Sequence, residues 1–241
     1  MSKKFSVIVA DCPWPFKDSL KMSDVPRGAL ANYDTMTISD IQSLPVKMAC
    51  HPDGAVLCLW VPSSLLAEGL ETMKAWGFKH KQTYVWVKTK VEPLNTLTKS
   101  IKRVLKDQLP ILKTSLSPKV AKGKLLIEGL IDRCEGFITS NVLSFGMGRL
   151  FRQTHEICLI GTSNNKIYQK LQNKSQRSVS FAPNLKHSAK PEHLQNSLDI
   201  MFPGATKLEL FARRERKGWT CLGNECPSSL GEDIKVSLSK L

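Results

Sequence analysis

The sequence predicts an α/β fold in which a parallel sheet is covered by helices. Two apolar runs, Val7–Ala10 and Ala55–Val61, are continuous rather than alternating, which is typical of strands buried on both faces. A helical pattern over residues 62–76 separates the second run from a third strand, Thr83–Lys88. Strand, helix and strand in this order indicate parallel neighbours. We expect one domain over residues 1–241.

The motif Asp11-Cys12-Pro13-Trp14 follows the first strand directly. Pro13 and Pro15 lack a backbone N–H, so the chain after Asp11 leaves the sheet. A carboxylate, the Cys12 carbonyl and an aromatic ring therefore stand at the carboxyl end of a strand, where open α/β sheets bind ligands. This set suits a flat heterocycle with an exocyclic amine, whose two hydrogens Asp11 and the Cys12 carbonyl can accept. Taken alone, the motif is equally compatible with a proline-rich turn in which Trp14 only packs.

The remaining elements are predicted from periodicity and from residues that start or stop helices and strands. Residues 17–32 are expected to form a loop, and Thr37 or Ser39 to cap a short helix that ends near Pro45. Later elements are a strand over 157–161, a helix from about 191 to 203, a strand over 206–211, a last strand near 219–222 and a loose tail over 226–241.

Residues 91–147 interrupt the alternation of strands and helices. An apolar stripe from Leu97 to Leu109 has lysines and arginine on its other face, and Leu125–Cys134 can form a further helix. We expect a helical insertion whose basic face contacts nucleic acid and supplies a target-recognition element.

Charge is the main clue to the partner. The formal net charge is +14, and no Asp or Glu occurs from Ile157 to Pro191. Such an imbalance favours a polyanion, that is, nucleic acid, over an ordinary basic enzyme.

Other patterns argue against several classes of protein. There is no apolar run of about 18 residues and no room for a signal peptide before the first strand, so we expect no membrane association. The seven cysteines include no C-x-x-C pair, which predicts reduced thiols in a cytoplasmic protein. No metal site is expected, because His187 and His193 lack cysteines at ligand spacing.

A dispersed set of motifs occurs in a fixed order along the chain. The pieces are Asp11–Trp14, Tyr33–Met36, Leu59–Val61, Val85–Thr89, Arg152–Cys158, Lys190-Pro191, Leu208–Arg213, Trp219 and Leu222–Glu225. Together they resemble the DPPW-type adenine N6-methyltransferase family, which includes the catalytic subunit that methylates adenosine in mRNA and many phage and bacterial DNA adenine methylases. The similarity extends over nearly the whole chain except residues 91–147 and the tail.

This resemblance implies a Rossmann-like, circularly permuted fold that uses S-adenosyl-L-methionine. Asp11 and the Cys12 carbonyl would hold the adenine amine, Pro13 would shape the turn and Trp14 would stack on the base. The resemblance also implies that Asp11 lies near the methionine end of the cofactor. The other positions that correspond to cofactor-binding residues are Lys190, Arg213, Asn224 and Glu225.

The chain departs from the family pattern at three places. Cys12 replaces a common proline, Glu225 replaces a common glutamine, and Arg214-Glu215-Arg216 replaces a common Pro-His-Asn. The backbone carbonyl at Cys12 is retained, whereas Glu225 keeps an acceptor and loses donors.

The predicted function is methyl transfer to N6 of adenine in DNA, by a phage or bacterial enzyme that acts alone or as a homo-oligomer. The compact chain and its basic insertion favour DNA over RNA, although the same site would serve RNA. A catalytically degenerate nucleic-acid-binding partner subunit is a second hypothesis, because Cys12 and Arg214–Arg216 depart from the family. A methyltransferase acting on a small molecule or a protein ranks last.

Overall fold

The computed structural model describes residues 3–15, 35–92, 142–144, 146, 150–184 and 189–241, together with the single positions 95, 99, 103 and 106. The loop expected over 17–32 and most of the helical insertion expected over 91–147 lie outside these residues. The chain divides into two compact units, which are described separately. Unit 1 contains Met1–Val85, Glu156–Ser178 and His193–Leu241, and unit 2 contains Trp86–His155 and Val179–Glu192.

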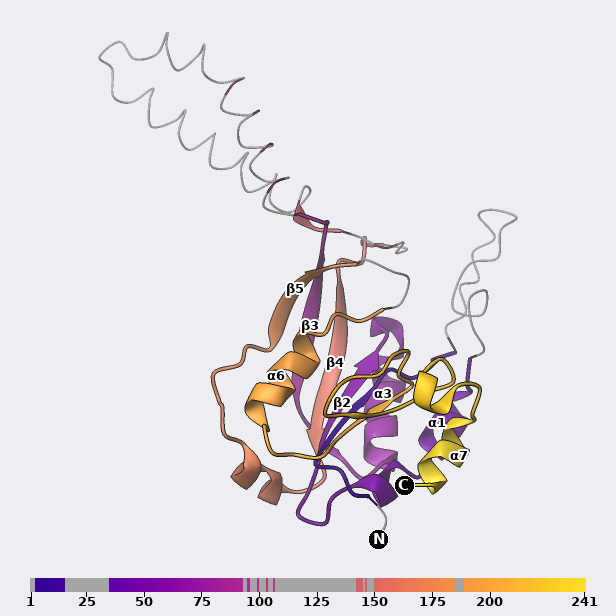
Figure 1. The fold of residues 1–241 in the computed structure, drawn as a ribbon. Coiled ribbons are helices and arrows are strands. Elements are labelled where there is room, and N and C mark those ends of the chain that lie inside the picture. Colours follow the sequence, from indigo (N-terminus) through magenta and orange to yellow (C-terminus); the bar gives the residue numbers. More distant parts are fainter. Residues whose placement is uncertain are drawn as a thin grey trace. The chain divides into compact units, whose positions relative to one another are not determined.

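Seven strands form one mixed sheet in the order β5-β3-β4-β2-β1-β6-β7 (Figure 1). In unit 1, β1 is parallel to β2 and β6, and β6 is parallel to β7. The strands are β1 (Val7–Ala10), β2 (Val56–Val61), β3 (Lys79–Thr89), β4 (His155–Thr162), β5 (Val179–Pro183), β6 (Lys207–Leu210) and β7 (Thr220–Leu222).

One feature of the sheet corrects the sequence prediction. β4 runs antiparallel to β2, with Val56 opposite Thr162 and Val61 opposite Ile157, so the sheet is not wholly parallel. The continuous apolar sequence of β4 indicates burial on both faces but does not indicate the direction of the strand. The segment between β3 and β4 is long enough to bring the chain to either end of the sheet, so its length does not fix the direction either.

The helices predicted near residues 37–45, 62–76 and 191–203 are present, whereas those over Val46–Ala49, Asn165–Lys170, Pro227–Ser229 and Ile234–Ser239 were not predicted. Thr37 caps α1, because its Oγ1 accepts a hydrogen bond from the Asp40 backbone N–H at 3.1 Å. Gly69 lets α3 approach β2 closely, since a Cβ there would lie 2.7 Å from the methyl carbons of Val61. The helices are α1 (Ile38–Gln42), α2 (Val46–Ala49), α3 (Leu66–Ala75), α6 (His193–Met201), α7 (Ile234–Ser239) and the 3-10 helices η2 (Ser63–Leu65), η3 (Asn165–Lys170) and η4 (Pro227–Ser229). None of the helices within the described ranges is long and apolar enough to cross a membrane.

The main core of unit 1 lies on one face of β1 and β2. Ile8 and Leu57 from the strands pack there with Ile41 from α1, with Met73 from α3 and with Trp76, the residue that caps the end of α3. Alternate residues of a strand point to opposite faces, so these positions cover one side of the sheet. Burial of this kind is the main stabilising contribution to the fold.

The expectation of a loose tail over 226–241 is wrong. Residues 227–229 form η4 and residues 234–239 form α7, which Asp233 caps through the Lys235 N–H. Ile234 and Leu238 are each 7% exposed and belong to the main core. The sequence does carry local signals for α7, since Asp233 is a capping residue and Ile234, Leu238 and Leu241 recur at helical spacing, and contact with β7 adds to its order.

Candidate active site

The carboxyl ends of three parallel strands meet at one edge of unit 1. Ala10 lies opposite Leu210, and Leu210 lies opposite Leu222, so the residues that follow β1, β6 and β7 share that edge. Hydrogen bonds continue past the strands: the Asp11 N–H donates to the Leu210 carbonyl at 3.4 Å, and the Ala212 N–H to the Leu222 carbonyl at 2.9 Å. Asp11, Arg213, Asn224 and Glu225 therefore follow strand ends at the edge where open α/β sheets bind ligands.

The turn after β1 is held at several points. The Trp14 N–H donates to the Cys12 carbonyl at 2.9 Å, and the Met36 N–H donates to the Pro13 carbonyl at 2.9 Å. The indole Nε1 of Trp14 donates to the carbonyl of Trp60 at 2.8 Å. These bonds fix the path of the turn and leave the Asp11 side chain half-buried at the strand end.

Trp14 is part of the core in this structure. Its side chain is 4% exposed and belongs to the main hydrophobic cluster. Packing is thus one role of this residue, and the predicted stacking on a base stays a prediction.

The backbone carbonyl and the thiol of Cys12 have different chemistry. A carbonyl oxygen has two lone pairs, so the bond from Trp14 leaves the Cys12 oxygen able to accept a second hydrogen bond. Burial raises the pKa of the Cys12 thiol well above its ordinary value, and the negative charge of Asp11 raises it further. The thiol therefore stays protonated at neutral pH and is a poor nucleophile.

Arg213 and Glu225 come together from two loops. The Nε of Arg213 lies 3.6 Å from Oε1 of Glu225, and the two side chains are 38% and 51% exposed. This ion pair lies at the carboxyl edge of the sheet and places guanidinium donors beside carboxylate acceptors. Lys190, one of the five predicted cofactor-binding residues, belongs to unit 2, and its contact with a cofactor stays a prediction.

The loop after β7 is anchored by a residue that the sequence analysis missed. Ser229 Oγ accepts from the Gly223 N–H and donates to the Gly223 carbonyl, both at 2.9 Å. Gly223 leaves no room for a side chain, because a Cβ would lie 2.2 Å from the carbonyl oxygen of Ala212. The Gly231 N–H also donates to the Asn224 carbonyl at 2.8 Å. Ser229 lay in the segment expected to be loose, and no local pattern marks it.

The loop between β6 and β7 is tied to α6 through Arg216. Its guanidinium donates to Asp199 Oδ2 at 2.8 Å and to Asn196 Oδ1 at 2.7 Å, and Asp199 Oδ1 accepts from Trp219 Nε1 at 3.0 Å. Lys207 Nζ lies 3.4 Å from the same Asp199 oxygen. Arg216, which stands where the family commonly has an asparagine, therefore fastens this loop to α6.

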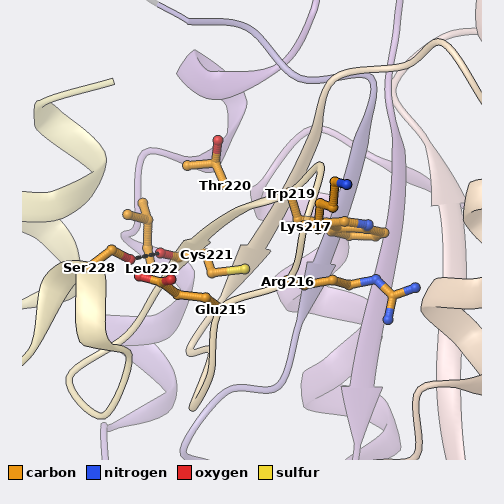
Figure 2. Close-up of a pocket in the computed structure, with 8 residues that line it drawn as sticks. All are labelled: Glu215, Arg216, Lys217, Trp219, Thr220, Cys221, Leu222 and Ser228. Atoms are coloured by element: carbon orange, nitrogen blue, oxygen red, sulfur yellow. Dashed lines mark hydrogen bonds between the residues drawn. The ribbon is translucent and has the colours of Figure 1, made fainter.

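A surface pocket lies along β7 (Figure 2). Figure 2 shows Arg216 and Trp219 next to each other, with Ser228 on the other side, where its hydroxyl donates to the Cys221 carbonyl at 3.0 Å. The lining residues are Glu215, Arg216, Lys217, Trp219, Thr220, Cys221, Leu222 and Ser228. Asp11 and Arg213 do not belong to this lining, although Leu222, the last residue of β7, does.

A second carboxyl group lies close to Asp11 on β6. Glu209 Oε1 accepts from Gln195 Nε2 of α6 at 3.2 Å. Burial raises the pKa of Glu209, and the charge of Asp11 adds a smaller increase. The alternating sequence of β6 gave no signal that this residue lies near the site.

The mixed sheet with its polar carboxyl edge defines an α/β, Rossmann-like methyltransferase fold. The sequence model of the MT-A70 family matches residues 5–122 and 138–225, and the chain belongs to that family. The match includes residues 91–122 and 138–147, so the prediction that the family similarity excludes residues 91–147 is wrong. Only residues 123–137 interrupt the match.

Curated relatives fall into two groups. An Arabidopsis thaliana protein named N(6)-adenosine-methyltransferase MT-A70-like is 26% identical over 92% of this chain and 24% of its own length. The human N(6)-adenosine-methyltransferase catalytic subunit METTL3 is 23% identical over 92% of this chain and 28% of its own length. This chain thus spans about a quarter of these relatives. The type II methyltransferase M.MunI of a Mycoplasma species is 24% identical, over 94% of this chain and 80% of its own length.

Proposed function

We propose that this protein transfers a methyl group to N6 of adenine in nucleic acid, and that DNA is its substrate. The observation that carries the proposal is the half-buried Asp11 at the carboxyl edge of the sheet, beside a backbone carbonyl with a lone pair to spare. Membership of the MT-A70 family supports the class of reaction.

The residues at this edge fit S-adenosylmethionine, the methyl donor of MT-A70 methyltransferases. Arg213 supplies guanidinium donors and Glu225 carboxylate acceptors, a set that can hydrogen-bond ribose hydroxyls, and their ion pair is exposed enough to be reached. Asn224 adds an amide, which both donates and accepts hydrogen bonds. When bound, the cofactor supplies an electrophilic methyl group on a sulfonium.

In this proposal, Asp11 and the Cys12 carbonyl each accept one hydrogen of the adenine amine. The amine is a poor nucleophile because its lone pair is delocalised into the ring. Two acceptors orient it, and the Asp11 charge stabilises the positive charge that develops on N6. The protonated Cys12 thiol takes no covalent part. In duplex DNA the base must first leave the stack.

Support for DNA comes from one relative. The type II methyltransferase M.MunI is 24% identical to this chain, and the match extends over 80% of that protein's length. RNA is the second candidate substrate, because several relatives are named N(6)-adenosine-methyltransferases.

The test is methyl transfer from labelled S-adenosylmethionine to unmethylated DNA and, in parallel, to RNA, followed by nucleoside analysis. The proposal predicts label in N6-methyladenine of DNA for the wild-type protein and for Asp53→Ala, which changes an exposed aspartate that pairs with His51 and Lys170. Asp11→Ala should abolish methyl transfer. Label in RNA alone would show that RNA, and not DNA, is the substrate. If the protein neither transfers methyl groups nor binds the cofactor, the result would favour a degenerate partner subunit.

A further inference from the structure

The acid-free stretch from Ile157 to Pro191 begins in β4, and the part that follows β4 in unit 1 lies at the edge of the sheet opposite to Asp11. Val56 at the start of β2 pairs with Thr162 at the end of β4 and with Val7 at the start of β1. The 3-10 helix η3 follows β4 and therefore lies where β1 and β2 begin, at the lower end of unit 1 in Figure 1.

Hydrogen bonds hold η3 at this edge. Ser163 Oγ accepts from the Ala55 N–H at 2.8 Å, and Lys170 Nζ donates to Ser6 Oγ at 3.2 Å. Asn164 Oδ1 caps η3 through the Lys166 N–H at 2.9 Å. From Ser6 to Asp11 the strand rises by about 16 Å, so η3 and Asp11 are at opposite ends of β1.

Several basic side chains gather around η3. Lys79 and Lys81 lie on one face of β3, and Lys81 Nζ donates to Asn165 Oδ1 of η3 at 3.5 Å. Lys79, Lys81 and Lys166 are exposed, whereas Lys170 is half-buried and lies 3.9 Å from Asp53. These four lysines, together with Tyr168, are called the amino-edge surface.

The amino-edge surface also has an aromatic ring. Tyr168 is 47% exposed and lies in η3 between Lys166 and Lys170. Lysines beside an exposed aromatic ring are the combination that binds the phosphates and the bases of a nucleic-acid strand. An acidic protein segment would use the lysines but has no need of the ring.

We propose that the amino-edge surface is a second nucleic-acid-binding surface, which contacts the phosphate backbone away from the base at Asp11. This inference rests on the proposed function, in which the substrate is nucleic acid. A strand advances by about 3.4 Å per nucleotide, so about five nucleotides cover the length of β1. The surface would hold the part of the substrate that flanks the target.

The experiment measures binding of fluorescent DNA, single-stranded and duplex, by anisotropy over a range of salt concentrations. The test variant combines Lys79→Gln, Lys81→Gln and Lys166→Gln. The matched control combines Lys217→Gln, Lys235→Gln and Lys240→Gln, which removes the same charge from exposed positions of unit 1 elsewhere. Thermal melts verify that both variants are folded.

For the test variant we expect the slope of log affinity against log salt to fall by about two to three and the affinity at low salt to fall at least about tenfold. The control should change much less. Tyr168→Ala should weaken binding of single strands about fivefold or more and binding of duplex less. Equal effects of the test and control variants would overturn the inference.

Two further outcomes separate this inference from its alternatives. If the wild-type protein binds and methylates nucleic acid and the test variant binds it unchanged, only the inference about the amino-edge surface fails. If the wild-type protein binds neither DNA nor RNA, the proposed function fails as well. If the test variant loses binding to polyglutamate while its binding to nucleic acid is unchanged, the inference about the amino-edge surface is overturned in favour of an acidic protein partner.

Discussion

Arg213 Nε lies 3.6 Å from Glu225 Oε1, and this contact joins the loop after β6 to the loop after β7. Both residues are more than a third exposed, so the pair adds only about 0–1 kcal/mol to stability. The main effect of this ion pair is therefore to hold a guanidinium and a carboxylate group side by side at the carboxyl edge.

The first prediction concerns the affinity for S-adenosylmethionine. Arg213→Ala should weaken binding about tenfold or more, because a charged hydrogen-bond donor at the cofactor is lost. Glu225→Gln restores the residue common in the family and should retain binding. Calorimetric titration measures both, with the exposed Lys217→Ala as the control. An unchanged affinity for Arg213→Ala would remove this residue from the cofactor site.

The second prediction concerns the close approach of Gly223 to Ala212. In Gly223→Ala the new Cβ would meet a backbone oxygen at 2.2 Å, so the ends of β6 and β7 must separate. Destabilisation of about 1–3 kcal/mol is expected, together with weaker cofactor binding. Gly204→Ala is the matched control, because no atom lies within 4 Å of its added Cβ. Urea unfolding measures both, and equal stabilities would show that the loops are not tightly packed.

The third prediction tests the packing of the C-terminal helix α7. Ile234→Ala and Leu238→Ala should each lower the free energy of unfolding by about 2–4 kcal/mol, because both side chains are buried in the core. Val236→Ala changes a neighbour that is 47% exposed and should cost less than about 0.5 kcal/mol. If all three variants unfold alike, α7 does not contribute to the core.

The fourth prediction concerns pH. Burial raises the pKa of Glu209 above its ordinary value of 4.5, so the folded protein binds this proton more tightly than the unfolded chain does. The contribution of Glu209 to stability therefore increases as pH falls through the raised pKa toward 4.5, and decreases again as pH rises.

Glu209→Gln should accordingly be stabilising relative to the wild-type protein at neutral pH, and this advantage should shrink toward pH 5. The amide oxygen can still accept from Gln195. Denaturant unfolding at a series of pH values measures the difference, and Glu215→Gln, on an exposed side chain, is the control. A difference that is independent of pH would contradict the raised pKa.

Features that depend on local sequence were predictable, and features that depend on distant contacts were not. The cap at Thr37 and the turn at Asp11 follow from neighbouring residues, and the structure confirms both. The direction of β4 depends on which distant strand it pairs with, whereas α7 was missed although the Asp233 cap is a local signal for it. Ser229 is significant only because folding brings it to Gly223.

The partner of Arg216 was equally hidden in the sequence. Its guanidinium binds Asp199, seventeen residues earlier on α6. The sequence showed only that the family's common asparagine is absent at this position. The fold was predictable because apolar periodicity reports burial directly, whereas side-chain pairing at the site depends on loops with no periodic signal.

The most direct test of the central claim, that Asp11 orients the adenine amine, is a single-turnover methyl-transfer rate. It should be measured on adenine-containing DNA at saturating S-adenosylmethionine for Asp11→Asn, which keeps the size of the side chain, and for Asp53→Asn as the control. We predict that Asp11→Asn slows transfer to N6 by about a hundredfold or more, because it removes the charge that stabilises the transition state. The control should react at the wild-type rate. A rate for Asp11→Asn within about threefold of the wild-type rate would contradict the claim.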